Sequence, residues 1–341
     1  MESIYNFTED MLKEYWLSKG EKPFRASQII EWLYRHQITS FDEITNMKKS
    51  LIEELKQDFT LDRLDCVAHQ KSKDGTQKFL FQLEDGNFIE TVLMHQEYGY
   101  SVCVTSEVGC NMDCQFCASG MKKKLRNLEV KEMVLQILMV AKLSKVRVSH
   151  VVIMGIGEPF DNYENVISFL KLINHPLGLE IGARHITVST CGLVPKILEY
   201  TNFDLQVNLA ISLHAPNNKI RNQLMPINKA YPIEQLLDAI AKYIEKTNRR
   251  VTIEYILLKG INDSIACADE LATVLHGLNV YVNLIPYNEV AGKPYERSTK
   301  EDMIAFFDWL KKRRINVQLR KEQGSDIDAA CGQLRSKHMN S

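Results

Sequence analysis

Short apolar runs alternate with longer amphipathic stretches from about residue 99 onward. Each run is rich in Val, Ile or Leu with few polar interruptions, which is typical of strands covered on both faces. The runs lie at 101–105, 150–155, 185–190, 207–214, 251–258, 281–287 and 315–320. This strand–helix alternation predicts an α/β fold with a parallel sheet, either open or curled into a barrel.

Apolar residues at helical spacing occupy the intervals between these runs. One stripe comprises Val130, Met133, Val134, Ile137, Leu138 and Ala141, and another comprises Val166, Phe169, Leu170 and Ile173. Further along, Ser298 and Glu301 have the spacing of a capping box, so we expect Ser298 to cap the helix that contains residues 304–310.

The first part of the chain follows other patterns. Residues 1–62 place apolar residues at helical spacing in a charge-rich sequence, which predicts a small helical accessory domain. In residues 63–98, the turn signals Lys73-Asp74-Gly75 and Glu84-Asp85-Gly86 separate apolar runs, which predicts a β-meander. We therefore divide the chain into the accessory domain, the meander and an α/β core over residues 99–341.

Composition places the chain among ordinary globular proteins, since 45% of its 341 residues are hydrophobic and 25% are charged. The net charge of −1 gives no reason to expect a nucleic-acid partner, which would need local basic patches. The N-terminal sequence lacks the apolar segment of a signal peptide, and no run approaches the ~18 apolar residues of a membrane helix. We expect a cytoplasmic protein without membrane association, whose thiols stay reduced.

Three cysteines lie close together as Cys110, Cys114 and Cys117. Thiolates are the ligands of iron–sulfur clusters, and three of them leave one iron of a [4Fe-4S] cluster open to bind S-adenosylmethionine (SAM). Zinc motifs usually show a second Cys or His pair, which this stretch lacks. The spacing therefore predicts a cluster that cleaves SAM to a radical, with Phe116 just before the last cysteine as a supporting feature.

Polar residues interrupt several apolar runs at their carboxyl ends. Since the active site of a parallel barrel gathers at this end, we expect these residues to lie together and to bind SAM. Glycine at 157 permits close approach of a ligand, and Glu158 can accept from the SAM ammonium. The candidate SAM-binding residues are Gly157, Glu158, Ser189, Ser212, Leu213, His214 and Asn288. A plain strand-ending turn remains an alternative for residues 155–159.

These motifs make the chain similar to the RlmN/Cfr family of radical SAM RNA methylases, with the closer match to its RlmN members. The match runs nearly end to end. It includes KPFRASQI (22–29), SVCVTSEVGCNMDCQFCAS (101–119), VIMGIGEPFDNY (152–163), ARHITVSTCG (183–192) and DIDAACGQL (326–334). The resemblance implies a partial (β/α)6 TIM-like radical SAM barrel and an accessory domain, containing Phe24 and Arg25, that helps to bind RNA.

The resemblance also implies a reaction. It implies methylation of C2 of adenosine 2503 in 23S rRNA and of adenosine 37 in tRNA, with a [4Fe-4S] cluster and two SAM molecules. By motif match, Cys331 carries the methyl group, Cys103 resolves the RNA adduct through a transient disulfide, and Glu90 accepts the C2 proton. From the residues alone, Cys331 would be a core residue and Glu90 a salt-bridged strand residue. We expect a monomer that takes electrons from an external donor.

The sequence leaves other points open. The basic stretch Lys122-Lys123-Lys124-x-Arg126 is either a phosphate-binding patch or a solvated face. Glu107 stands where the family usually has Gln, which bears on RNA preference. Cys66, Cys191 and Cys267 match no family role and are expected in the core. The alternative functions are Cfr-type methylation of adenine C8, which confers ribosomal antibiotic resistance, and a noncatalytic iron–sulfur or zinc-stabilised RNA-binding protein.

Overall fold

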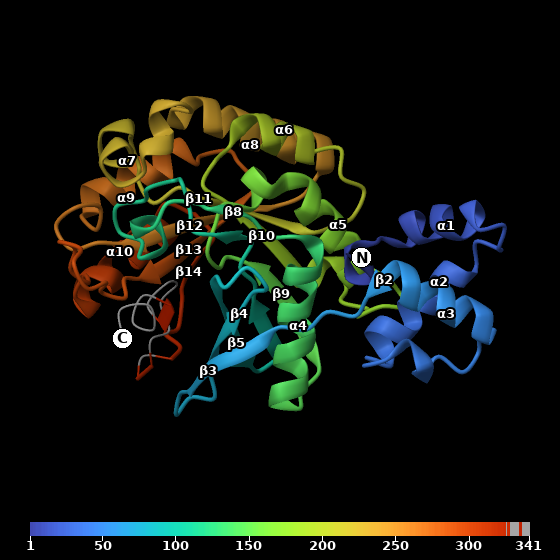
Figure 1. Ribbon diagram of the computed structural model, residues 1–341. Coiled ribbons are helices and arrows are strands. Elements are labelled where there is room, and N and C mark those ends of the chain that lie inside the picture. The colour runs from blue at the N-terminus through green and yellow to red at the C-terminus, as the bar shows by residue number, and fades with distance from the viewer. Residues whose placement is uncertain (325, 328–333, 336–341) are drawn as a thin grey trace.

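The computed structural model describes residues 1–324, 326–327 and 334–335, and its main body is a curved ten-stranded sheet (Figure 1). The strand order is β14-β13-β12-β11-β10-β9-β6-β5-β4-β3. The strands are β3 (Asp65–Lys71), β4 (Gln77–Gln82), β5 (Phe88–Gln96), β6 (Gly99–Cys103), β9 (Val148–Ile153), β10 (Ile186–Thr190), β11 (Asn208–Ser212), β12 (Val251–Leu257), β13 (Val280–Pro286) and β14 (Val317–Leu319).

Strand direction divides this sheet into two parts. From β6 through β14 every neighbouring pair is parallel, which confirms the α/β prediction. The predicted meander is β3, β4 and β5, which pair antiparallel and join the core sheet through β6. The meander is thus an extension of the core sheet, and its turns contain Gly75 and Gly86 with positive φ, as the turn signals predict.

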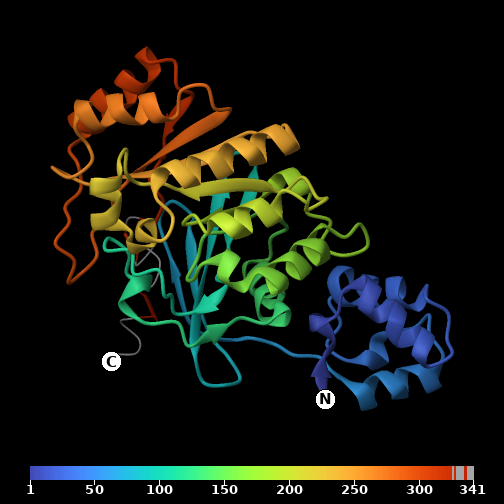
Figure 2. The same cartoon turned by 90° about the horizontal axis from the view of Figure 1, so that it is seen from above.

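Helices line the outside of the curved sheet between successive parallel strands (Figures 1 and 2). They are α4 (Val130–Ser144), α5 (Tyr163–Asn174), α6 (Val194–Tyr200), α7 (Asn218–Leu224), α8 (Ile233–Thr247), α9 (Ile265–Val274) and α10 (Lys300–Lys312). Helix α10 begins one residue later than expected, because Thr299 caps it by accepting from Asp302 N–H. The Ser298 hydroxyl instead donates to Asp263 at 2.7 Å.

The two faces of the parallel strands differ in chemistry because side chains alternate along a strand. Outward residues such as Val188, Ile211 and Ile253 are fully buried in the core. The opposite, inner face has polar residues in register on neighbouring strands, since Ser212 pairs with Glu254, and Glu254 with Asn283. A polar inner face next to an apolar outer face marks the interior of the curved sheet as the place for ligands.

The N-terminal part forms a helical module to one side of the sheet (Figure 2). It contains α1 (Glu9–Ser18), α2 (Arg25–Ile30) and α3 (Lys49–Asp58), with a short pair of strands, β1 (Glu2–Ser3) and β2 (Phe59–Thr60). Fully buried Leu12 and Trp16 form part of its core. Polar contacts tie it to α4, since Asn6 Oδ1 accepts Lys131 N–H at 2.9 Å. No helix among the described residues is long and apolar enough to cross a membrane.

Candidate active site

The three clustered cysteines lie on a loop closed by a small hairpin. Strands β7 (Glu107–Val108) and β8 (Arg126–Asn127) pair antiparallel at its base. Inside the loop, the Cys117 N–H donates to Cys114 O and the Cys110 N–H donates to Lys122 O, both at 3.1 Å. The backbone therefore fixes the loop by short-range hydrogen bonds, as expected for a segment that presents ligands.

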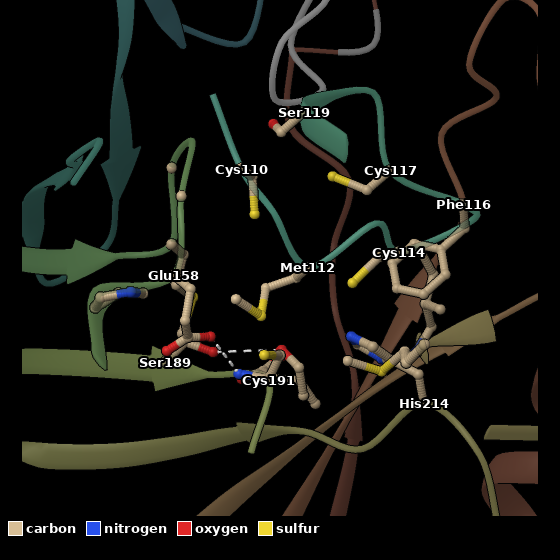
Figure 3. Close-up of a pocket in the computed structure, with 18 of the residues that line it drawn as sticks. Cys110, Met112, Cys114, Phe116, Cys117, Ser119, Glu158, Ser189, Cys191 and His214 are labelled. Carbon is tan, nitrogen blue, oxygen red and sulfur yellow. Dashed lines mark hydrogen bonds between the residues drawn. The ribbon is translucent and has the colours of Figure 1, made fainter. Parts of the chain in front are cut away.

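The thiols of this loop face a common space (Figure 3). They line a cavity of about 280 Å3 together with residues from the carboxyl ends of the parallel strands. Burial raises the pKa of Cys110 to about 12 and that of Cys114 well above its usual range. Bound metal would supply the positive charge that poorly solvated thiolates need, so three converging, half-buried thiols suit a cluster.

Glu158 closes one side of this cavity (Figure 3). It follows β9 and is buried, and its carboxylate accepts the backbone N–H of Phe160 at 2.9 Å and that of Cys191 at 2.7 Å. Burial raises the pKa of Glu158, and the hydrogen bonds oppose that rise. The preceding Gly157 has a φ of +111°, which favours glycine. Side-chain hydrogen bonds with Thr190 and Cys191 also hold this carboxylate at the edge of the cavity.

Ser189, Ser212 and His214 line the same cavity from neighbouring strands. The Oγ atoms of the two serines lie 3.5 Å apart. His214 has a φ of +56°, and its Nδ1 accepts the Ile256 N–H at 3.0 Å. Burial lowers the pKa of His214 to about 3, so the ring is neutral and its proton is on Nε2. The predicted gathering of strand-end residues is therefore seen for these three side chains and Glu158.

Two other predicted SAM-binding residues lie elsewhere. Leu213 is fully buried and does not line the cavity; its N–H donates to Glu254 O at 3.1 Å. Asn288 is exposed and lines a separate cavity of about 180 Å3. Both cavities share Ile285 and Arg320, so Asn288 lies near the main cavity without facing it.

Arg221 holds the ends of two strands by hydrogen bonds, although the sequence analysis did not select it. This fully buried side chain donates to Cys191 O at 2.6 Å, to Leu213 O at 3.2 Å and to Asn228 Oδ1 at 3.0 Å. Burial lowers the pKa of Arg221 to about 10, so it stays charged at neutral pH. Its position on α7 among the apolar residues Ile220 and Leu224 was the signal available in the sequence.

Glu254 lines the cavity and was also missed by the sequence analysis. It is buried on β12, and its Oε2 accepts from Asn283 Nδ2 at 2.8 Å. Burial raises the pKa of Glu254, while the Arg320 charge and the Asn283 hydrogen bond oppose this. Cys191 also lines this cavity, in addition to being buried as predicted.

Glu90 lies on the inner face of β5, where it is buried. Its Oε2 lies 2.9 Å from Lys78 Nζ on β4, and its Oε1 accepts the Arg335 N–H at 2.6 Å. Cys103 on β6 pairs in register with Val92, two residues from Glu90, so both side chains lie on the same face. The structure thus places Cys103 and Glu90 on one inner surface, with an ion pair at Glu90.

Cys331 lies outside the described residues. The structure describes contacts of Asp326, before Cys331 in the sequence, and of Arg335, after it. Before it, the Asp326 carboxylate accepts from the Ser72 hydroxyl and from Lys73 N–H in the β3–β4 turn, and after it Arg335 N–H donates to Glu90. The meander therefore holds the chain on either side of the segment that carries Cys331.

The basic stretch after the cysteine loop is partly internal. Lys124 contacts Asp161 at 2.7 Å, and Arg126 contacts Asp85 at 2.6 Å and Glu132 at 2.7 Å. These two cations are engaged in ion pairs. Lys123 is exposed, so its side chain can be reached by an RNA phosphate.

Comparison with known families agrees with this geometry. The family model of the Radical SAM superfamily matches residues 105–269, and that of the Ribosomal RNA large subunit methyltransferase N-terminal domain matches residues 3–61. A Spiroplasma citri protein named "Probable dual-specificity RNA methyltransferase RlmN" is 57% identical, covering 99% of this chain and 98% of its own. The chain belongs to the RlmN family of radical SAM RNA methyltransferases.

Another curated relative and a solved structure agree. A Listeria welshimeri protein of the same name is 57% identical over 99% of this chain and 94% of its own. A crystal structure of a radical SAM methyltransferase from Sphaerobacter thermophilus matches with a TM-score of 0.91 and 41% identity, covering 98% of this chain and 99% of that one. The radical SAM fold is thereby confirmed, and the chain is an enzyme that methylates RNA.

Proposed function

We propose that this enzyme methylates C2 of adenosine 2503 in 23S rRNA and of adenosine 37 in tRNA. The observation that carries the proposal is the single cavity shared by Cys110, Cys114, Cys117 and Glu158 with Ser189, Ser212 and His214. Relatives that match over nearly their full length are named dual-specificity RNA methyltransferases. The enzyme acts as a monomer that receives electrons from an external donor.

Cys110, Cys114 and Cys117 would hold a [4Fe-4S] cluster. When bound, this cluster supplies the electron that cleaves SAM into methionine and a 5′-deoxyadenosyl radical. Glu158 orients the SAM ammonium, and the hydroxyls of Ser189 and Ser212 bind its carboxylate or ribose. The neutral His214 directs its Nε2–H towards the cavity as a donor. Asn288 would complete the SAM site only after a shift of its loop towards the main cavity.

Cys331 would carry the methyl group, which its sulfur takes from one SAM by polar substitution. The radical chemistry that the bound cluster would supply with a second SAM would be directed at this S-methyl group, so that its carbon, after loss of one hydrogen atom, could bond to adenine C2. Glu90 then accepts the C2 proton. The Cys103 thiolate would attack the Cys331 sulfur as the bond between this sulfur and the transferred carbon breaks. The released carbon would take up a proton to become the methyl group, the one surplus electron would return to the cluster, and a Cys103–Cys331 disulfide would remain for external reduction. The shared face of Cys103 and Glu90 supports these roles.

Anaerobic reconstitution tests the cofactor part of this proposal. Wild-type protein should bind about four irons and release 5′-deoxyadenosine on reduction with SAM. A variant with all three loop cysteines changed to Ala should bind none, and Cys66→Ala, on an outer strand, should behave as wild type. A wild-type protein that binds only zinc would favour a noncatalytic RNA-binding protein.

Nucleoside analysis tests the substrate part. Incubation with 23S rRNA and tRNA transcripts should yield 2-methyladenosine, detected by mass spectrometry after digestion and compared with authentic standards. The Cys103→Ala variant should accumulate a covalent RNA–protein adduct. Formation of 8-methyladenosine would instead establish the Cfr-type reaction.

A further inference from the structure

A buried ion pair connects the cysteine loop with the Gly157–Glu158 segment that follows β9. The Glu107 side chain is fully buried; its Oε1 lies 2.7 Å from Lys124 Nζ, and its Oε2 accepts the Glu158 N–H at 2.9 Å. Lys124 also contacts Asp161 at 2.7 Å. One carboxylate therefore contacts both sides of the candidate cofactor site.

The backbone surrounding this ion pair belongs to the same two elements. Glu107 is in β7, at the start of the hairpin that closes the cysteine loop, and Lys124 directly precedes Leu125 and β8 at its end. Lys124 N–H donates to Asn111 Oδ1 at 3.1 Å, next to Cys110. The ion pair thus joins the two ends of the loop that presents the three cysteines.

Close packing extends the connection to Gly157. A Cβ atom on Gly157 would lie 2.6 Å from Glu107 Cβ and 2.7 Å from Glu107 Cγ, which leaves no room for a side chain. The Glu107 side chain therefore contacts Gly157 directly and hydrogen-bonds the next amide. A shift of Glu107 would move the cysteine loop relative to the carboxylate of Glu158.

Charge explains why both residues are needed. Burial raises the pKa of Glu107 to about 7, and Lys124 is the main influence that opposes this rise. An unpaired buried charge costs several kcal/mol, so removing Lys124 alone is more harmful than removing both charges, whereas Lys124 keeps its contact with Asp161 when Glu107 alone is changed. The side chain of Lys124 is 15% exposed, and both its acidic partners lie within 2.7 Å, which leaves it poorly suited to bind RNA phosphate.

We propose that Glu107 and Lys124 are positioning residues, which hold the cysteine loop and the Gly157–Glu158 segment in one fixed arrangement for SAM. This inference rests on the proposed cofactor chemistry, and it assigns the charge of Glu107 to the cofactor site rather than to RNA preference. Neither residue touches the reacting atoms.

The experiment measures SAM binding by the reconstituted, reduced protein without RNA. The readouts are iron content and the dissociation constant for SAM, taken from the change that SAM produces in the electron paramagnetic resonance spectrum. The variants are Lys124→Met, Glu107→Gln and the double variant. Lys242→Met serves as a matched control, because it breaks an exposed ion pair of the same length, 2.7 Å, with Asp238.

The effects of the two substitutions on SAM binding should depend on each other. Lys124→Met should weaken SAM binding at least about tenfold, because a buried carboxylate loses its partner. Glu107→Gln keeps an acceptor for the Glu158 N–H and should change binding by about threefold or less. The double variant should bind SAM more tightly than Lys124→Met. Lys242→Met should match wild type.

Three outcomes would decide against the inference. SAM binding of wild-type strength in Lys124→Met would overturn it, as would equal losses in Lys124→Met and in the double variant. If Lys124→Met does not fold, the double variant Glu107→Gln/Lys124→Met is compared with Glu107→Gln. SAM binding that is fivefold weaker in the double variant than in Glu107→Gln would also overturn the inference. Wild-type protein that takes up no iron would instead contradict the proposed function, so the two failures are distinguishable.

Discussion

Lys78 Nζ lies 2.9 Å from Glu90 Oε2, and the two side chains are only 0% and 3% exposed. The pair joins β4 to β5 on the inner face of the meander. The second oxygen of Glu90 accepts the Arg335 N–H at 2.6 Å. The residue proposed to accept the C2 proton is therefore also a contact point for the chain beyond Cys331, and Lys78 supplies its counter-charge.

Lys78→Met should destabilise the protein by about 3 kcal/mol or more, because the buried Glu90 carboxylate would lose its partner. Urea unfolding followed by circular dichroism measures the change. The double variant Lys78→Met/Glu90→Gln should recover most of this stability and still lack RNA methylation, since an amide cannot accept the proton. An unchanged unfolding midpoint in Lys78→Met would show that the ion pair contributes nothing.

Arg221→Lys should weaken SAM binding about tenfold or more while the charge is retained, because a lysine lacks the planar fork that reaches several carbonyl groups. Arg221 donates to Cys191 O and Leu213 O, which belong to two different strand ends. Equilibrium binding of SAM to the reconstituted enzyme measures this effect. Arg249→Lys is the control, and wild-type affinity in Arg221→Lys would contradict the role assigned to the fork.

The stability of the wild-type protein should fall at acid pH because of His214. Burial lowers the pKa of His214 to about 3, below its value of about 6.5 in the unfolded chain. The unfolded state therefore binds a proton first, and the stabilisation present above pH 6.5 is lost as the pH falls towards 3. Between pH 7.5 and 5.5 we expect a loss of about 1.4 kcal/mol.

His214→Asn provides the matched comparison for this pH effect. Asn tolerates the positive φ of this position and offers an acceptor for the Ile256 N–H, but it does not titrate. Unfolding free energies at the two pH values should converge for wild type and variant as the pH falls. If the unfolding free energies of wild type and variant change with pH in the same way, His214 has the same protonation in the folded and unfolded states.

Asp326→Ala should separate methyl transfer from SAM cleavage. Asp326 accepts from Ser72 and Lys73 in the β3–β4 turn, which is remote from the cysteine loop in the sequence. Iron content and reductive release of 5′-deoxyadenosine should stay at wild-type levels, while RNA methylation falls about tenfold as the segment with Cys331 is held less firmly. Mass spectrometry of the protein reports methylation of Cys331. Equal loss of iron and methylation would contradict this separation.

The sequence predicted best where chemistry or burial is local. Strands buried on both faces read as apolar runs, so β9 to β13 could be located closely. The cysteine loop could be recognised because its three cysteines lie within eight residues. The strand ends could be grouped because parallel strands bring their carboxyl ends to one edge.

The residues that were missed act through contacts that are distant in the sequence. From the sequence alone, Lys78 is an ordinary strand residue; its role depends on β5, which brings Glu90 beside it. The role of Arg221 likewise depends on the carbonyl groups that it contacts, which lie far away in the sequence. Asn288 lines a neighbouring cavity in place of the main one, because the direction of the loop after β13 is not encoded in strand spacing. Ser298 and Thr299 are equally good caps, and the contact of Ser298 with Asp263 decided between them.

The contact between Asp326 and Ser72 has a consequence for the order of folding. It joins residues 254 positions apart, and it bridges from the segment after edge strand β14 to the turn beside the other edge strand, β3. Contacts that close so long a loop carry a large entropic cost and are expected to form late. During synthesis, the cysteine loop and the strands up to β13 leave the ribosome before Asp326 does. The segment proposed to carry the methyl group is thus synthesised after these elements, so a chain cut before it would keep the three cysteines proposed to hold the cluster and lack the proposed methyl carrier.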